Sequence, residues 1–153
     1  MHKRMKTWED RFKRKLQRKH KHLWKHAFHR LMKKSSTLRS SLKRRSREYE
    51  VEFDISLTEI RELLLKCYNR HCRYCNLHLD VSNIVCDHIV PLSMGGGSNL
   101  KNLQMICKRC NTRKGPLLGT EYIKILNFLN KQDAHTRDYV LRKLATSDVM
   151  GRN

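Results

Sequence analysis

One segment decides the fold of this chain, residues 72–114, which read CRYCNLHLDVSNIVCDHIVPLSMGGGSNLKNLQMICKRCNTRK. A Cys-x-x-Cys pair stands at each end, Cys72 with Cys75 and Cys107 with Cys110. Two residues between paired cysteines let both thiolates reach one ion, and two such pairs complete the tetrahedral shell of zinc. The 31 residues between the pairs are more than a simple zinc ribbon uses. We therefore expect a structural zinc, with a functional element looped out between the two pairs.

Zinc explains these cysteines better than redox chemistry does. A thioredoxin-type site needs one Cys-x-x-Cys pair at the end of a strand in a βαβ unit, and the second pair does not fit that pattern. The N-terminus lacks the apolar core of a secretory signal, so we expect a reducing, cytoplasmic location in which the six cysteines form no disulfide framework. The two remaining cysteines, Cys67 and Cys86, are expected to be buried and inert.

The residues between the pairs predict two strands and a helix. Residues 83–87 and 103–106 have strand composition, and the glycine-rich stretch 95–99 lies in the predicted loop between them. Two strands joined by one loop are expected to be antiparallel. A short helix is expected after Cys110, until Gly115 and Pro116 end it. The local plan is strand, loop, strand, helix.

This pattern resembles the HNH endonuclease family over roughly residues 57–116. The resemblance implies a small ββα-metal (His-Me finger) core stapled by a zinc site of four cysteines. With the flanking helices and the basic helical N-terminal arm that periodicity and charge predict, we expect an α+β fold. Small free-standing members of the family are common in bacteriophages and mobile introns, which suggests such an origin. The matching motifs are Cys72-x-x-Cys75, Asp87-His88-Ile-Val-Pro-Leu, Gly95-Gly96, Asn102-Leu103 and Cys107-x-x-Cys110-Asn111-x-x-Lys114-Gly115.

The resemblance also implies roles for four residues. His88 corresponds to the general base, Asp87 to the acidic ligand of a catalytic cation, Asn111 to the final ligand, and Asn102 to the middle asparagine. Phosphodiester hydrolysis needs a deprotonated water and stabilised negative charge, which a neutral imidazole and a divalent cation supply. Adjacent strand residues point to opposite faces, so Asp87 and His88 serve one site only if the strand ends or bends there, as Pro91 suggests.

The expected catalytic cation is Mg²⁺ or Mn²⁺. Many family members have histidine where this chain has Asn111, and an amide oxygen is a harder ligand than imidazole. The amide of Asn102 is expected to bond across the long loop and fix the backbone that carries His88. Taken singly, an Asp-His pair in a strand is more often a structural pair, and an asparagine after a cysteine pair is more often a helix cap. Together with the cysteines, these residues favour catalysis.

The charge of the chain indicates an anionic partner. The formal net charge is +20, far more than solubility requires, and nucleic acid is the leading candidate. Residues 1–50 hold 19 Lys and Arg against 4 Asp and Glu, whereas residues 51–153 hold 15 against 10. The candidate phosphate contacts near the site and on the N-terminal third are Lys108, Arg109, Arg113, Lys114, Arg11, Arg14, Lys15, Arg18, Arg44 and Arg45.

We expect two parts, a basic amphipathic helical arm with a linker over residues 1–47 and a nuclease domain with C-terminal helices over residues 48–153. Apolar residues at helical spacing predict one helix from Trp8 to about Leu31. Its uses are to lie along nucleic acid, to lie on an anionic membrane, or to pack its stripe on a partner or on the main domain. The other predictions are a mobile linker over 33–47, a strand over 49–55, a helix capped by Ser56 and Glu59, and helices near 121–130 and 134–145.

These observations predict a metal-dependent DNA endonuclease with a histidine base, one divalent cation and a structural zinc. The first alternative is a zinc-dependent nucleic-acid-binding module without catalysis. The second is a membrane-surface or partner-recruiting protein in which the basic arm is primary. No stretch approaches the roughly 18 consecutive apolar residues of a membrane span, so we expect DNA and no membrane as partner, in the host cytoplasm if the chain is phage-encoded, with any phage or host protein partner left unspecified.

Overall fold

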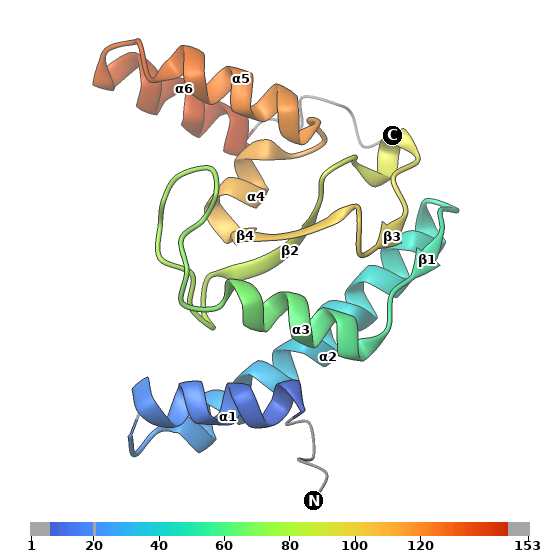
Figure 1. Cartoon of the computed structure of the whole chain (residues 1–153). Helices are drawn as coiled ribbons and strands as arrows, with labels where there is room; N and C mark the ends of the chain where they lie inside the picture. The colour runs from blue at the N-terminus through green and yellow to red at the C-terminus, as the bar shows by residue number, and fades with distance from the viewer. Residues whose placement is uncertain (1–6, 20, 147–153) are drawn as a thin grey trace, which may run out of the picture.

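The centre of the structure is an antiparallel hairpin followed directly by a helix. The computed structural model describes residues 7–19 and 21–146. Strand β2 (Ile84–His88) pairs with β4 (Leu103–Cys107), from Ile84 opposite Cys107 to His88 opposite Leu103. Helix α4 (Lys108–Lys114) begins at the residue after β4. In Figure 1 this hairpin lies between α4 on one side and the longer helices α2 (Trp24–Glu48) and α3 (Leu57–Cys67) on the other. The predicted strand, loop, strand, helix order is confirmed.

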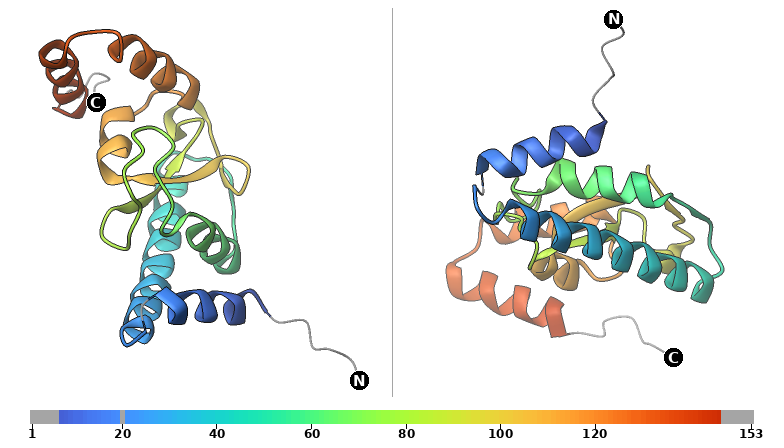
Figure 2. Two further views of the ribbon diagram at one scale, coloured as in Figure 1. Left: turned by 60° about the vertical axis from the view of Figure 1, so that its left-hand side comes forward. Right: turned by 90° about the horizontal axis from the view of Figure 1, so that it is seen from below.

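Six helices surround or extend the hairpin, so the fold mixes helix and strand as expected. The capping box before α3 forms as predicted: Ser56 Oγ accepts from Glu59 N at 3.1 Å, and a Glu59 carboxylate oxygen accepts from Ser56 N at 2.8 Å. The two predicted C-terminal helices form beyond α4, and the second of them contacts α4 (Figures 1 and 2). The elements not yet given are α1 (Trp8–Lys19), β1 (Phe53–Asp54), a 3₁₀ turn (Leu92–Met94), β3 (Ser98–Asn99), α5 (Gly119–Leu129) and α6 (Ala134–Thr146).

A second, very short sheet ties the loop of the hairpin to the N-terminal part of the chain. Strand β3 lies in the stretch predicted as loop, and it pairs in parallel with β1, with Phe53 opposite Ser98. Ser98 N donates to Glu52 O at 2.7 Å. The strand predicted over 49–55 is thus reduced to two residues, whose pairing fixes Ser98 beside α2.

The prediction of a mobile linker over 33–47 is wrong, because these residues belong to the 25-residue helix α2. Leu31, Ser35, Leu42 and Ser46 are buried and recur at separations of four and seven, so they form one face toward α3 and the short sheet. A serine-rich composition is typical of linkers, but the small side chain of serine also fits a close contact between helices when its hydroxyl has a hydrogen-bond partner. Ser35 Oγ donates to Met32 O at 2.7 Å.

The single helix predicted from Trp8 to about Leu31 is also wrong. Helix α1 ends at Lys19 and α2 begins at Trp24, and the chain reverses between them (Figure 2). The reversal brings the ring of Phe12 to 5.9 Å from Phe28 and to 6.5 Å from Tyr68, centroid to centroid. The apolar stripe therefore packs on the main domain, one of the three expected uses. No described helix is long and apolar enough to cross a membrane.

Candidate active site and metal centre

The four cysteines of the two pairs converge on one point. Their Sγ atoms all lie within 4.8 Å of one another, and Cys75 Sγ is 3.5 Å from Cys107 Sγ. A zinc tetrahedron with bonds of about 2.3 Å has edges of about 3.8 Å, so the cluster fits zinc. Backbone amides already face the sulfurs, since Cys107 N donates to Cys72 Sγ at 3.5 Å and Cys110 N to Cys107 Sγ at 3.4 Å. The predicted zinc quartet is confirmed as a four-cysteine cluster compatible with zinc.

The cysteine thiols fall into two groups. Within the cluster, a hydrogen bond from Cys110 is the largest cause that lowers the pKa of Cys72 well below its usual range. The same hydrogen bond raises the pKa of Cys110, and burial raises the pKa of Cys107. Zinc binds thiolates, so its binding would release the protons that these sulfurs hold. Cys67 and Cys86 lie outside the cluster, and burial raises the pKa of both thiols, to about 12 for Cys86. Cys86 is buried, as expected, whereas Cys67 is only partly buried.

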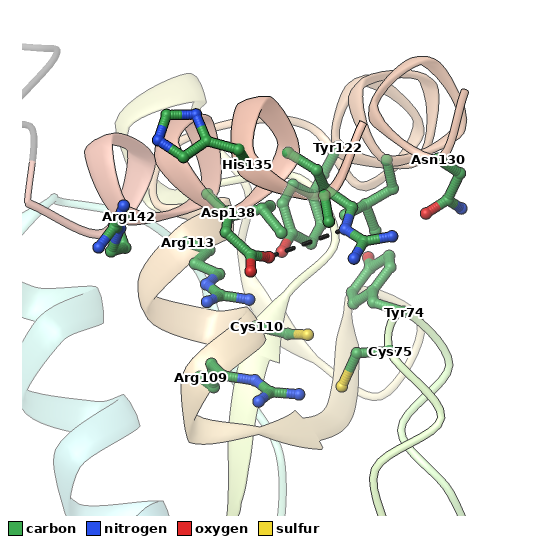
Figure 3. Close-up of a pocket in the computed structure, with 14 residues that line it drawn as sticks. Tyr74, Cys75, Arg109, Cys110, Arg113, Tyr122, Asn130, His135, Asp138 and Arg142 are labelled. Atoms are coloured by element: carbon green, nitrogen blue, oxygen red, sulfur yellow. Dashed lines mark ion pairs between the residues drawn. The ribbon is translucent and has the colours of Figure 1, made fainter. Parts of the chain in front are cut away.

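A cavity of about 750 Å³ opens beside the cluster, between α4, α5 and α6 (Figure 3). Arg109 and Arg113 of α4 line it together with Cys75 and Cys110. A hydrogen bond to Cys75 is the main cause that raises the pKa of Arg109. The guanidinium of Arg109 therefore contacts the sulfur of Cys75, a contact that sequence reasoning missed because residue 75 lies in a different segment. Arg109 remains exposed and Arg113 is partly exposed.

The carboxylate of Asp87 lies on the side of β2 that faces α4. Asp87 is 7% exposed; its Oδ2 accepts from Gln104 Nε2 at 2.8 Å and lies 3.2 Å from Lys114 Nζ. Lys114 Nζ also donates to His88 O at 2.8 Å and is 1% exposed. Burial is the main cause that raises the pKa of Asp87, and Lys114 and Gln104 oppose it. The prediction that Lys114 contacts nucleic acid is therefore wrong, because its ammonium lies in the interior of the protein and pairs with the buried carboxylate of Asp87.

Asn111 stands three residues before Lys114 on α4, so the two side chains lie on similar sides of the helix. Asn111 is partly exposed. The carboxylate oxygens of Asp87 and the amide oxygen of Asn111 are of the donor type that Mg²⁺ and Mn²⁺ prefer. The ammonium of Lys114 competes for the same carboxylate, and a bound cation must share or displace it.

The imidazole of His88 lies on the opposite face of β2. Its Nε2 is 2.8 Å from Ser98 Oγ, which is 2.7 Å from Ser46 Oγ of α2. Although His88 is the last residue of β2, the alternation of side chains still separates it from Asp87. Burial, then Arg45 and Lys114, lower the pKa of His88 to about 4, so the imidazole is neutral at pH 7. No sequence signal linked Ser46 or Ser98 to His88.

The amide of Asn102 spans the loop between the two strands. Asn102 Oδ1 accepts from Val90 N at 2.8 Å, and Asn102 Nδ2 donates to Val90 O at 3.0 Å and to Gly97 O at 2.9 Å. Gly96 lies against the same contact: a Cβ on this residue would be 2.0 Å from Val90 O. The amide therefore holds the backbone just after His88, where the sequence predicted a clamp.

The basic residues expected on the arm are distributed over α1 and α2. Arg11, Arg18 and Arg44 are exposed, and Arg14 donates from Nε to Asp10 O at 3.2 Å. Arg44 forms an ion pair with Glu48. Arg45 is half-buried near His88, while Lys15 has a side chain outside the described part of the structure. Lys108 at the start of α4 is exposed.

Two comparisons with known proteins agree with this geometry. Residues 72–117 match the HNH endonuclease family, so the resemblance seen in the sequence is confirmed for this segment. One relative is the CRISPR-associated endonuclease Cas9 of Corynebacterium diphtheriae, which is 44% identical over 48 residues. The match covers 31% of this chain and 4% of that protein, so the chain corresponds to a small part of it. The HNH family suggests metal-dependent nuclease activity.

Proposed function

We propose that the chain is a metal-dependent DNA endonuclease in which His88 is the general base and a single divalent cation is held by Asp87 and Asn111. The observation that carries the proposal is the unit of β2, β4 and α4 closed by four convergent cysteines, which coincides with the segment that matches HNH endonucleases. The structural zinc keeps α4, and with it Asn111, in place against the hairpin.

In the proposed mechanism His88 and the cation act from the two faces of β2, at the end of this strand. His88 takes the proton of the attacking water, and a phosphate anion beside the imidazole offsets the effect of Arg45 and Lys114 on its pKa. When bound, Mg²⁺ or Mn²⁺ supplies positive charge for the phosphate and the leaving oxygen. Asn102 keeps the backbone after His88 in one conformation, so the base stays aligned.

The exposed basic side chains are proposed to hold the DNA backbone. Lys108, Arg109 and Arg113 lie on α4, and Arg11, Arg14, Arg18 and Arg44 lie on the N-terminal helices. Contacts of this kind set affinity and register without reading sequence.

A plasmid assay tests the proposal. Zinc-loaded protein is incubated with supercoiled plasmid and Mg²⁺, and nicked or linear DNA is expected with wild type but not with EDTA. His88→Gln is the matched variant, because glutamine fills much of the imidazole space and keeps a polar contact to Ser98; its zinc content and circular dichroism report whether it folds. Cleavage is expected to disappear in His88→Gln and Asn111→Ala. Intact plasmid with zinc-loaded wild type contradicts the proposal.

A zinc-dependent nucleic-acid-binding module without catalysis is the second candidate. Two observations favour it: Lys114 pairs with the carboxylate of Asp87, and His88 is only 4% exposed. Gel shifts run on the same samples separate the two functions, since a pure binding module retards the DNA and leaves it uncut.

A further inference from the structure

Two buried serine side chains connect His88 to helix α2. Ser98 Oγ lies between His88 Nε2, at 2.8 Å, and Ser46 Oγ, at 2.7 Å. The exposed fractions are 4% for His88, 0% for Ser98 and 1% for Ser46. Each of these polar groups therefore depends on its neighbour rather than on water for a hydrogen bond. Ser46 lies outside the segment 72–117 that matches HNH endonucleases.

The backbone places both hydroxyls. Ser98 is held in β3 by its pairing with β1 and by the bond from Ser98 N to Glu52 O at 2.7 Å. Ser46 lies on the buried face of α2, one turn after Leu42, which is 1% exposed. The strand and the helix hold the backbone of the two serines, and the side-chain hydrogen bonds hold their hydroxyls beside the imidazole.

We propose that Ser98, supported by Ser46, is the positioning residue of His88 and fixes the tautomer in which Nε2 carries the hydrogen. The inference rests on the proposed role of His88 as general base. A neutral imidazole has one N–H group and one acceptor nitrogen. Nε2 is engaged in the buried contact with Ser98, and Nδ1 has no hydrogen-bond partner among the described residues. The nitrogen that meets the attacking water is therefore Nδ1.

The hydrogen bonds between His88, Ser98 and Ser46 can run in two directions, and only one of these directions lets Nδ1 accept a proton. Nδ1 accepts a proton only if Nε2 holds the hydrogen, so Nε2–H donates to Ser98 Oγ and the Ser98 hydroxyl donates to Ser46 Oγ. In the opposite direction the Ser98 hydroxyl would donate to Nε2, and Nδ1 would carry the hydrogen and could not act as a base. The serine pair thus performs the task that a carboxylate or a carbonyl performs for histidines at many catalytic and metal sites.

Steady-state cleavage of plasmid by four serine variants tests the positioning role. Ser98→Ala is expected to lower kcat about 10-fold to 100-fold with KM within about twofold of wild type. Ser98→Thr keeps the hydroxyl and is expected to retain most of the wild-type kcat. The kcat of Ser46→Ala is expected to lie between those of Ser98→Ala and Ser98→Thr. Ser35→Ala is the matched control, because Ser35 is equally buried on α2 but bonds to Met32 O. Its kcat is expected to equal that of wild type.

The tautomer is measured separately from activity. Long-range ¹H–¹⁵N spectra of zinc-loaded wild type at neutral pH are expected to show His88 as the Nε2–H tautomer, and Ser98→Ala is expected to show a mixture. An Nδ1–H tautomer in wild type, or a wild-type kcat in Ser98→Ala, overturns the inference. If wild type cleaves no DNA, the proposed function fails, and the spectra still decide whether the serines fix the imidazole.

Discussion

Replacement of Asn102 by alanine measures how much the side-chain amide of this residue stabilises the backbone that follows β2. The side chain makes three hydrogen bonds, two with Val90 and one with Gly97, and alanine replaces none of them. The bond to Gly97 is partly buried and contributes about 1 kcal/mol, whereas the two exposed bonds contribute less because water takes the place of the amide. We expect the free energy of unfolding to fall by about 2 kcal/mol in all.

The assay is urea unfolding of zinc-loaded protein, followed by circular dichroism, together with plasmid cleavage under native conditions. Asn83→Ala is the control, because the Asn83 amide makes two bonds in another loop, from Asp80 N at 3.1 Å and to His78 O at 2.8 Å. Both variants are expected to lose stability, but only Asn102→Ala is expected to lose cleavage, by about 10-fold to 100-fold. A stability loss below about 0.5 kcal/mol for Asn102→Ala, or equal cleavage in both variants, refutes the reasoning.

The remaining predictions concern the loop, the imidazole and the arm. Gly96→Ala is expected to lower the Tm more than Gly95→Ala does, because a Cβ at residue 96 would lie 2.0 Å from Val90 O. Gly95 has open space around it, so alanine there has to accommodate only the φ of +80°. The reverse order of Tm values contradicts the packing. Burial lowers the pKa of His88 from 6.5 to about 4, so the unfolded chain binds the extra proton between these pH values and stability falls as pH is lowered through this window. The loss is about 2 kcal/mol after allowance for solvent screening and is expected to be absent in His88→Gln at equal zinc content. Arg18→Gln is expected to reduce the slope of log affinity against log salt by about 0.9, and an unchanged slope removes Arg18 from the DNA interface.

Local chemistry made the central unit predictable. The cysteine spacing predicted the cluster, since paired thiolates two residues apart have few other uses inside a cell. The hairpin followed from strand composition on both sides of a glycine-rich loop, and α3 followed from the capping box at Ser56 and Glu59. In each case the determining residues lie within a few positions of one another, so pattern alone was sufficient.

Contacts between distant segments were not predictable in this way. Ser46 and Ser98 are 52 positions apart, and nothing in either local sequence indicates their contact. The serine-rich part of α2 resembled a linker because its stabilisation comes from tertiary packing of Leu31 and Leu42 rather than from helix propensity. In the sequence Lys114 has the pattern of a surface charge. Only the packing of β2 against α4 shows that its ammonium is buried and pairs with the carboxylate of Asp87.

The cover that α3 gives to β4, with α2 packed against α3, limits how this unit can be transplanted. A graft of residues 72–117 into a foreign scaffold would carry the sulfurs, the loop clamp and α4, but it would lack the helix that contacts β4, where Ile106 is 0% exposed at present. Any minimal version therefore has to bring α3 with it or supply an equivalent apolar cover, and it has to include α2 if the hydroxyl of Ser46 is to be kept.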